Sequence, residues 1–151
     1  MRAVAQRVSS ARVSAGADPI FAMGEGLLVL VGVGSSDTLA EAENLARRLV
    51  HLRIFDDDEH RMNRSLLDVG GTLGLVSQFT LYGDARHGRR PSYGAAAPGE
   101  QAAPLIEALA RSATGLGAPV VCGRFGAMMD VALVNSGPVT ILLDTEPGRS
   151  P

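Results

Sequence analysis

The sequence predicts a single α+β domain, in which a largely antiparallel, barrel-like sheet packs against two main helices. Three observations support this fold class. The 151 residues suit one domain. Strand-like segments outnumber helical ones, and two well-separated segments have helical spacing of apolar residues. We expect the domain to span residues 1–145 and residues 146–151 to form a flexible tail.

The N-terminal part predicts three strands. Residues 1–15 alternate loosely between apolar and polar side chains, as a strand does. Residues 16–26 carry turn residues on both sides of a short apolar piece, which predicts a hairpin. Residues 27–33 form a continuous apolar run between glycines, which predicts a central strand.

The first helix is predicted after this strand. Ser36 or Asp37 can cap it, and acidic residues follow near its start, with Arg47 and Arg48 near its end. Its apolar residues fall on one face at helical spacing: Leu39, Ala42, Leu45, Ala46, Leu49 and Val50. Residues 52–55 then predict a further strand.

The C-terminal half predicts the remaining elements. Residues 56–71 read as an exposed polar connection, and residues 72–82 as a strand. Residues 83–99 form a long loop of a kind that is often functional. Residues 100–115 predict the second helix, ended by its last glycine. Residues 118–144 predict two or three strands joined by glycine-containing turns.

Charge and cysteine content exclude several classes. The net charge is −2, so a broad, non-specific nucleic-acid binder is excluded and any RNA partner must meet a local patch. The single cysteine, Cys122, excludes an intramolecular disulfide, and we expect it to be a buried, inert thiol. The start lacks a signal-peptide core and the longest apolar run is too short for a bilayer, so we expect a soluble cytoplasmic protein without a membrane partner.

No cofactor or metal site is predicted. The acidic run that begins at Asp56 does not have the spacing of a calcium loop and reads as a solvated turn. His51, His60 and His87 do not have zinc-ligand spacing. Residues 32–37 lack the glycine pattern of a phosphate loop and read as a plain turn.

Four segments leave two interpretations each. The stretch VSQFTLYGD is either a core strand or the wall of a site, because Ser77, Gln78 and Thr80 need hydrogen-bond partners. The FGAMM segment, residues 125–129, is either a tight turn or a surface that packs on a flat base. The third segment is a loop with Arg86, Arg89 and Arg90, which is either solvated or faces phosphate. The fourth is the Gly137–Pro138 pair, which is either a plain turn or a special backbone position where a cis bond is accessible.

Taken together, these motifs resemble those of the D-aminoacyl-tRNA deacylases. The resemblance covers nearly the full chain, with SQFTL at residues 77–81 and the GPVT element at residues 137–140 as the two family signatures. Further matches are the RV pair at residues 7–8, LRIF at 52–55, MN at 62–63, GRRPS at 88–92 and FGAMM at 125–129. Ser136 and Tyr93 depart from the family, in which Asp and Phe are commoner.

The resemblance implies hydrolysis of the ester between a D-amino acid and tRNA, and cleavage of glycine mischarged on tRNA-Ala as a secondary activity. It implies an obligate homodimer in which Gly137 and Pro138, joined by a cis peptide, reach into the partner's site. Their carbonyls would hold the substrate's α-amino group, so that an L side chain collides with backbone.

The resemblance also assigns residues within the site. The wall that receives the aminoacyl end consists of Ser77, Gln78, Phe79 and Thr80. Arg7 would orient the Gly-Pro pair, Phe125 and Met129 would surround the terminal adenine, and the arginine loop (Arg86, Arg89 and Arg90) would face tRNA phosphates. The partners implied are a second copy of the chain and the 3′ end of aminoacyl-tRNA, with no DNA.

The chemistry needs positioning and an oxyanion site more than a strong base, because an ester already has a good leaving group. Backbone N–H groups around Phe79 and Thr80 can supply that oxyanion site. No base is evident in the sequence beside Thr80, so we expect this residue to position the substrate while the vicinal ribose hydroxyl helps to activate water.

Two rival functions use the same residues differently. An RNA-binding or DNA-unwinding accessory protein would need the loop from Arg86 to Arg90 but not SQFTL. A small-molecule esterase or peptidase would act through Thr80 or Ser77 and would need a nearby base. Salt separates RNA-dependent activity, which weakens as salt rises, from hydrolysis of a small ester.

Overall fold

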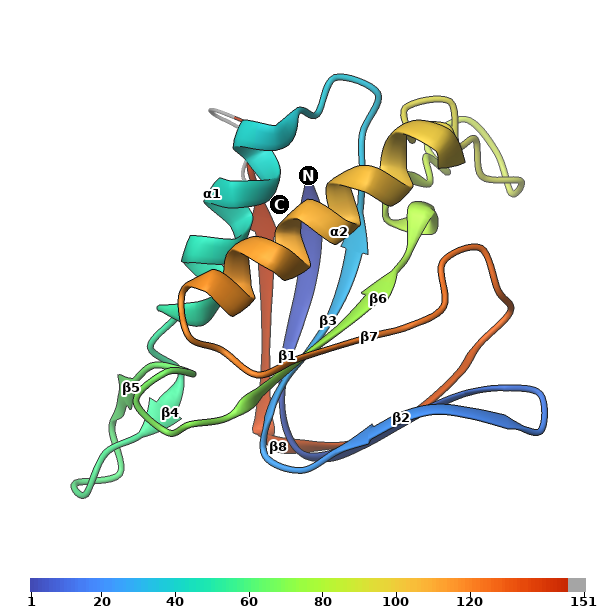
Figure 1. The fold of residues 1–151 in the computed structure, drawn as a ribbon. Coiled ribbons are helices and arrows are strands. Elements are labelled where there is room, and N and C mark those ends of the chain that lie inside the picture. Colours follow the sequence, from blue (N-terminus) through green and yellow to red (C-terminus); the bar gives the residue numbers. More distant parts are fainter. Residues whose placement is uncertain (147–151) are drawn as a thin grey trace.

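A long N-terminal strand organises the sheet in the computed structural model, which describes residues 1–146 (Figure 1). This strand, β1 (Arg2–Ala15), pairs antiparallel along one side with β8 (Asp130–Asp144). Its other side pairs antiparallel with β3 (Gly26–Gly32) near its start and with β2 (Asp18–Met23) near its end. The strand therefore belongs to both halves of a sheet that curls toward a barrel.

Two parallel pairings extend the sheet on the far side of β3. The strand β3 pairs with β6 (Thr72–Ser77), which in turn pairs with β7 (Val120–Cys122). Parallel neighbours need long crossover connections. The first crossover carries α1 (Leu39–Val50) and the second carries α2 (Gly99–Gly115), so both helices lie on one side of the sheet (Figure 1). The predicted α+β domain with two helices and a barrel-like sheet is confirmed, and the sheet is mixed.

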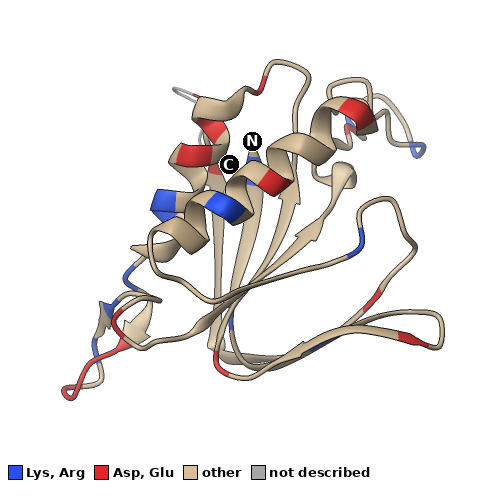
Figure 2. Ribbon diagram, in the orientation of Figure 1, with Lys and Arg blue, Asp and Glu red and all other residues tan. Residues whose placement is uncertain are grey.

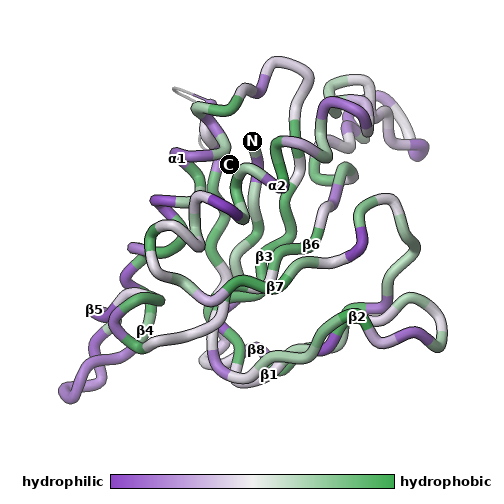
Figure 3. The backbone as a smooth tube through the Cα atoms, viewed as in Figure 1, coloured by the Kyte–Doolittle hydropathy of each residue, from purple (hydrophilic) through white to green (hydrophobic). Residues whose placement is uncertain are grey.

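The core lies between these helices and the sheet. The predicted apolar face of α1 is buried except for Leu39, which is 53 % exposed. A second, smaller cluster fills the inside of the curled sheet and includes Val8, Leu28 and Val76. Figure 3 shows the apolar residues along the central strands and the most hydrophilic backbone at two outlying segments, the loop after residue 82 and the β4–β5 hairpin. Apolar burial of this kind is the main stabilising contribution to the fold.

The cap of α1 differs from the prediction. Thr38 is the cap, and the Glu41 carboxylate accepts from its N–H at 2.8 Å. Asp37 is instead 6 % exposed and accepts from the N-terminal ammonium of Met1 and from the Gly34 N–H, each at 2.6 Å. Asp37 does not cap the helix because its carboxylate binds the buried N-terminal ammonium instead. Figure 2 shows the expected charge order along α1, acidic near the start and arginine near the end.

Two strand predictions also need correction. The strand expected at residues 52–55 is only β4 (Phe55–Asp56), which pairs with β5 (Met62–Arg64) inside the supposedly irregular polar connection. The strand expected at residues 72–82 ends at Ser77, and a 3-10 turn, η1 (Phe79–Tyr82), follows.

Of the two interpretations of Gly137–Pro138, the structure excludes the plain turn, because the pair lies within β8 at an irregular position of that strand. The pairing of β1 with β8 shifts here, so that one residue of β1, Arg7, faces residues 136–139 of β8. Proline has no N–H to donate, and this bulge of four residues against one accommodates it without breaking the strand. Residues 118–144 thus form two strands, β7 and β8.

Two further expectations concern the C-terminal tail and membrane-spanning segments. The predicted tail, residues 146–151, lies outside the described residues except for Glu146. Within residues 1–146, no helix is long and apolar enough to cross a membrane.

Candidate active site

The SQFTL segment forms a sharp exit from the sheet. Ser77 is the last residue of β6, and the Gln78 N–H donates to the Val31 carbonyl at 2.7 Å. The 3-10 turn then starts, and its backbone hydrogen bonds begin with the N–H of Leu81. The N–H groups of Phe79 and Thr80 precede that bond and have no acceptor among the described residues, as expected at the start of a helical turn. Both residues are exposed, so this turn offers two free donors at the surface.

The hydroxyl of Thr80 is oriented by an amide. The Gln78 side-chain amide donates to Thr80 Oγ1. An amide is not a base, so this contact positions the hydroxyl and does not activate it as a nucleophile. Phe79 presents a ring that is 57 % exposed.

The arginine loop is attached directly beside this turn. Asp84 and Ser92 exchange two backbone hydrogen bonds, at 2.8 and 2.9 Å, and close the loop. The Phe79 ring meets the Tyr93 ring edge-on, with 5.1 Å between centroids. The loop therefore starts and ends against the SQFTL turn.

Fewer arginines of this loop are free to bind a ligand than its sequence suggests. Arg86 is bound to Asp84 through Nη2 at 2.6 Å and Nε at 2.9 Å. This pairing lowers the pKa of the Asp84 carboxyl to about 2, and the negative charge of Asp84 partly offsets the positive charge of Arg86. Arg89 and Arg90 are exposed, and neither has a partner among the described residues. Two of the three predicted phosphate-facing arginines are thus free.

The FGAMM segment lies at the same end of the sheet. It follows β7, whose neighbour β6 leads into SQFTL, and the Gly123 N–H donates to the Leu75 carbonyl at 2.8 Å. The carboxyl ends of parallel strands meet at one edge, a common location for ligands. Phe125 is 43 % exposed and lies near Gly99 at the start of α2, whereas Met129 is half-buried.

The Gly137–Pro138 element is gripped by Arg7. The peptide bond between Gly137 and Pro138 is cis, and Gly137 has a φ of +115°. Arg7 is only 9 % exposed, and its Nε donates to the Ser136 carbonyl at 3.2 Å. A Cβ on Gly137 would lie 2.9 Å from Arg7 Nη2, so the absence of a side chain allows this close approach.

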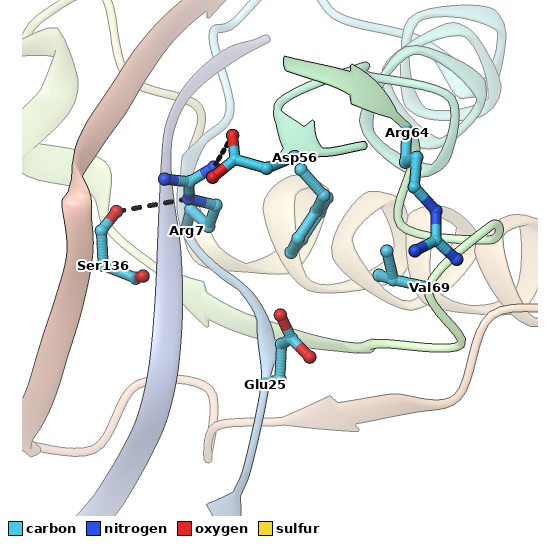
Figure 4. Close-up of a pocket in the computed structure, with 7 residues that line it drawn as sticks. Arg7, Glu25, Asp56, Arg64, Val69 and Ser136 are labelled. Carbon is cyan, nitrogen blue, oxygen red and sulfur yellow. Dashed lines mark hydrogen bonds and ion pairs between the residues drawn. The ribbon is translucent and has the colours of Figure 1, made fainter. Parts of the chain in front are cut away.

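A pocket of about 270 Å³ opens behind Arg7 (Figure 4). Its wall combines β1, β8 and the β4–β5 hairpin, and the Arg7 guanidinium binds the Asp56 carboxylate across it at 3.1 Å. Glu25 and Arg64 also point toward the pocket. The lining residues are Arg7, Glu25, Phe55, Asp56, Arg64, Val69 and Ser136.

One chain does not bring the two signatures together. Ser77 pairs with Val31, which pairs with Ala3, whereas the Gly137 bulge faces Arg7, four residues further along β1. With about 3.3 Å per residue along a strand and about 4.8 Å between strands, the two elements are roughly 15 to 20 Å apart. The two elements therefore lie at separate places on this chain.

Sequence reasoning missed two side chains of this region. Asp56 was assigned to a solvated acidic turn, and nothing in the run of three aspartates distinguishes the one that pairs with Arg7. Cys122, predicted to be buried, is exposed, although partial desolvation raises the pKa of its thiol. Within residues 1–146, no cluster of three or more metal-ligating side chains is found.

Comparison with known proteins matches the whole chain. The family model described as D-Tyr-tRNA(Tyr) deacylase matches residues 4–144. A D-aminoacyl-tRNA deacylase from Roseiflexus castenholzii is 61 % identical over 151 residues, which cover 100 % of this chain and 96 % of that protein. A D-aminoacyl-tRNA deacylase from Thermomicrobium roseum is 55 % identical over 145 residues, which cover 96 % of this chain and 94 % of that protein.

Two solved structures share the fold. The c-Myc DNA Unwinding Element Binding Protein is 36 % identical with a TM-score of 0.91, and the match covers 97 % of this chain and 99 % of that one. A probable eukaryotic D-amino acid tRNA deacylase has a TM-score of 0.80 over 94 % of this chain and 97 % of that one, at 18 % identity, which indicates a common fold.

Proposed function

Since the chain belongs to the D-Tyr-tRNA(Tyr) deacylase family, we propose that it hydrolyses the ester that joins a D-amino acid to the 3′ ribose of tRNA. The products are the free D-amino acid and free tRNA. The observation that carries this function is the 61 % identity to a D-aminoacyl-tRNA deacylase along the full chain. Glycine carried by tRNA-Ala is a second substrate in this proposal, because glycine has no side chain to exclude.

The SQFTL turn supplies the wall on which the ester is hydrolysed. The free N–H groups of Phe79 and Thr80 support a role as donors to the oxyanion that forms when water attacks the carbonyl carbon. The Thr80 hydroxyl, held by Gln78, positions the substrate, and Ser77 completes the wall at the end of β6. The vicinal ribose hydroxyl helps to activate water, so the chain itself needs no base.

A homodimer completes each site in this proposal. The Gly137 and Pro138 carbonyls of one subunit hold the α-amino group of a substrate on the SQFTL wall of the other, an arrangement that the separation of the two elements within one chain supports. The long strand β8 supports it too, because it pairs only with β1 in the described chain. Its exposed apolar side chains, typical of an interaction surface, are Val131, Val134 and Leu142.

Exclusion then gives the stereochemical choice. With the amino group and the ester carbonyl both fixed, an L side chain points into the backbone and a D side chain points into open space. Rejection by collision lets one site accept many D-amino acids and spare L-aminoacyl-tRNA.

The tRNA end would rest on the same edge of the sheet. Phe125 offers an exposed ring, with Met129 behind it, for contact with the terminal adenine. Arg89 and Arg90 would meet backbone phosphates. Arg86 would contribute less than the other two, because Asp84 already binds it.

A second candidate function is binding of nucleic acid as an accessory protein. It is favoured by one observation, the 36 % identity to a protein named for binding a DNA unwinding element. In that case the free arginines would matter and the SQFTL wall would not.

The test is a comparison of matched D-Tyr-tRNA and L-Tyr-tRNA, in which loss of the ester is followed over time. Rapid loss of the D ester alone supports the proposal, and its dependence on RNA should appear as a strong decrease with rising salt. Equal loss of both esters would indicate a general esterase. Loss of neither, with retained binding of uncharged nucleic acid, would favour the accessory function.

A further inference from the structure

We propose that Asp56 is a positioning residue for stereochemical selection, acting through Arg7 on the Gly137–Pro138 segment. The inference rests on the proposed function, since it concerns the carbonyls that would hold the substrate's amino group. It adds the β4–β5 hairpin, which neither signature includes, to the parts of the chain that determine selectivity.

Arg7 connects two elements that are far apart in the sequence. Its Nε donates to the Ser136 carbonyl of β8 at 3.2 Å. Its Nη1 donates to the Ile54 carbonyl at 2.7 Å and to the Asp56 carboxylate at 3.1 Å. The guanidinium is planar and rigid, so fixing the Nη1 side also fixes the direction in which Nε points.

Asp56 is the carboxylate that binds this guanidinium. The Arg7 side chain is 11 % exposed, so its charge is largely desolvated and needs a counter-charge to remain in place. Removal of the Asp56 charge by Asp56→Asn would leave the guanidinium with neutral acceptors alone, namely the carbonyls of Ile54 and Ser136 and the new amide oxygen. We then expect the guanidinium to shift toward the open pocket and the water in reach there.

A displacement of the Arg7 guanidinium would affect Gly137 directly, because the two are in contact. Nη2 of Arg7 lies 2.9 Å from the point where a Cβ on Gly137 would be, so the guanidinium and the backbone of Gly137 touch. A guanidinium that leaves this place removes the donor to Ser136 and the support beside Gly137. The carbonyls of Gly137 and Pro138 then become less well defined, and the exclusion of L side chains weakens.

The hairpin is suited to hold Asp56 in place. Asp56 pairs with Met62 of β5, and the preceding Phe55 is a buried anchor with 2 % exposure. The Asp56 side chain itself is 47 % exposed, so the ion pair is partly screened and we expect a moderate effect.

The experiment compares Asp56→Asn with wild type in hydrolysis of D-Tyr-tRNA and L-Tyr-tRNA. The readout is the ratio of the two kcat/KM values, which a purely structural loss would not shift selectively. We expect the D-over-L ratio to fall about two- to fivefold, the range of a half-exposed ion pair. Asp58→Asn is the matched control, because it removes the same charge from an exposed residue of the same hairpin that makes no side-chain contact among the described residues.

A second variant tests the mechanism and guards against misfolding. Ser136 lines the same pocket as Arg7 and Asp56, so Ser136→Asp in the Asp56→Asn background places a carboxylate near the guanidinium again. Recovery of the D-over-L ratio supports positioning through Arg7. An unchanged ratio in Asp56→Asn, an equal fall in Asp58→Asn, or a fall that Ser136→Asp does not reverse overturns the inference. A wild-type enzyme that hydrolyses both esters equally would refute the proposed function itself, and that outcome is visible before any variant is made.

Discussion

Replacement of Gly137 by alanine tests the Gly-Pro element most directly. The φ of Gly137 is +115°, which L side chains rarely adopt, and the new Cβ would lie 2.8 Å from Val139 Cγ2 and 2.9 Å from Arg7 Nη2. Ordinary contact begins near 3.4 Å, so both of these neighbours must move by about 0.5 Å. Arg7 is the neighbour whose displacement would disturb the proposed site.

The structure gives magnitudes for both stability and activity. An unfavourable backbone conformation costs about 1 to 3 kcal/mol, so the free energy of unfolding should fall by about 2 kcal/mol once the close contacts are included. A misplacement of 1 Å can lower a rate by about 100-fold, so a shift of half that size should lower kcat/KM for the D ester about tenfold.

The variant Gly16→Ala separates the effect of backbone strain from the effect of displacing Arg7. Gly16 also has a positive φ, +59°, but a Cβ there meets nothing within 4 Å. This control should lose about 1 kcal/mol of stability and keep the D-ester activity of wild type. Urea unfolding and D-Tyr-tRNA hydrolysis of both variants provide the comparison. If Gly137→Ala kept wild-type activity, or if Gly16→Ala lost as much of it, our account of the bulge would be wrong.

Three further predictions concern other parts of the molecule. Thr80→Ala should retain most of the single-turnover rate with D-Tyr-tRNA, since its hydroxyl only positions the substrate; a loss of several orders of magnitude would make Thr80 the nucleophile. Asp37→Ala should lower the free energy of unfolding in urea by about 3 kcal/mol, because it leaves the buried ammonium of Met1 unpaired, and a loss below about 1 kcal/mol would contradict this. The carboxyl of Asp84 should titrate near pH 2 in a ¹³C NMR experiment, and its pKa should be higher in Arg86→Gln, although still below the ordinary value because the N–H of residue 86 continues to donate to it. Because the folded pKa of Asp84 is depressed, its pairing with Arg86 stabilises the fold above about pH 4, and this contribution is lost as the pH falls toward 2.

Local patterns predicted most elements because each pattern has one dominant cause. The spacing of apolar residues in α1 matches the buried face, and the continuous run before it matches the buried strand β3. The same reasoning failed where a distant partner decided the outcome. The pairing of β3 with β6 ends at Ser77, so the polar residues after it leave the sheet although their pattern continues that of a strand.

The site illustrates the same limit. Motifs singled out SQFTL and Gly137–Pro138 as candidate site segments, because both are short, local and chemically unusual. The pairing of Arg7 with Asp56 spans 49 positions and depends on how the β4–β5 hairpin folds back toward β1. A run of acidic residues usually lies in solvent, and Asp56 is indeed exposed, so composition gave no sign of its ion pair with Arg7.

The sheet also explains why this kind of site would need two chains. Strand spacing is fixed by hydrogen bonding, and β1 and β3 lie between β8 and β6, so residues 136–139 and the end of β6 are held three strand spacings apart along the sheet. A two-fold axis offers a way to bring a bulge on an edge strand to the end of an inner strand, and it creates two identical sites at once. Stereochemical selection would then depend on the relative placement of two subunits. The position of the Gly137 and Pro138 carbonyls in the partner's site would in turn depend on how firmly each bulge is held. Arg7, which is buried between β8 and the β4–β5 hairpin, is the side chain that holds it.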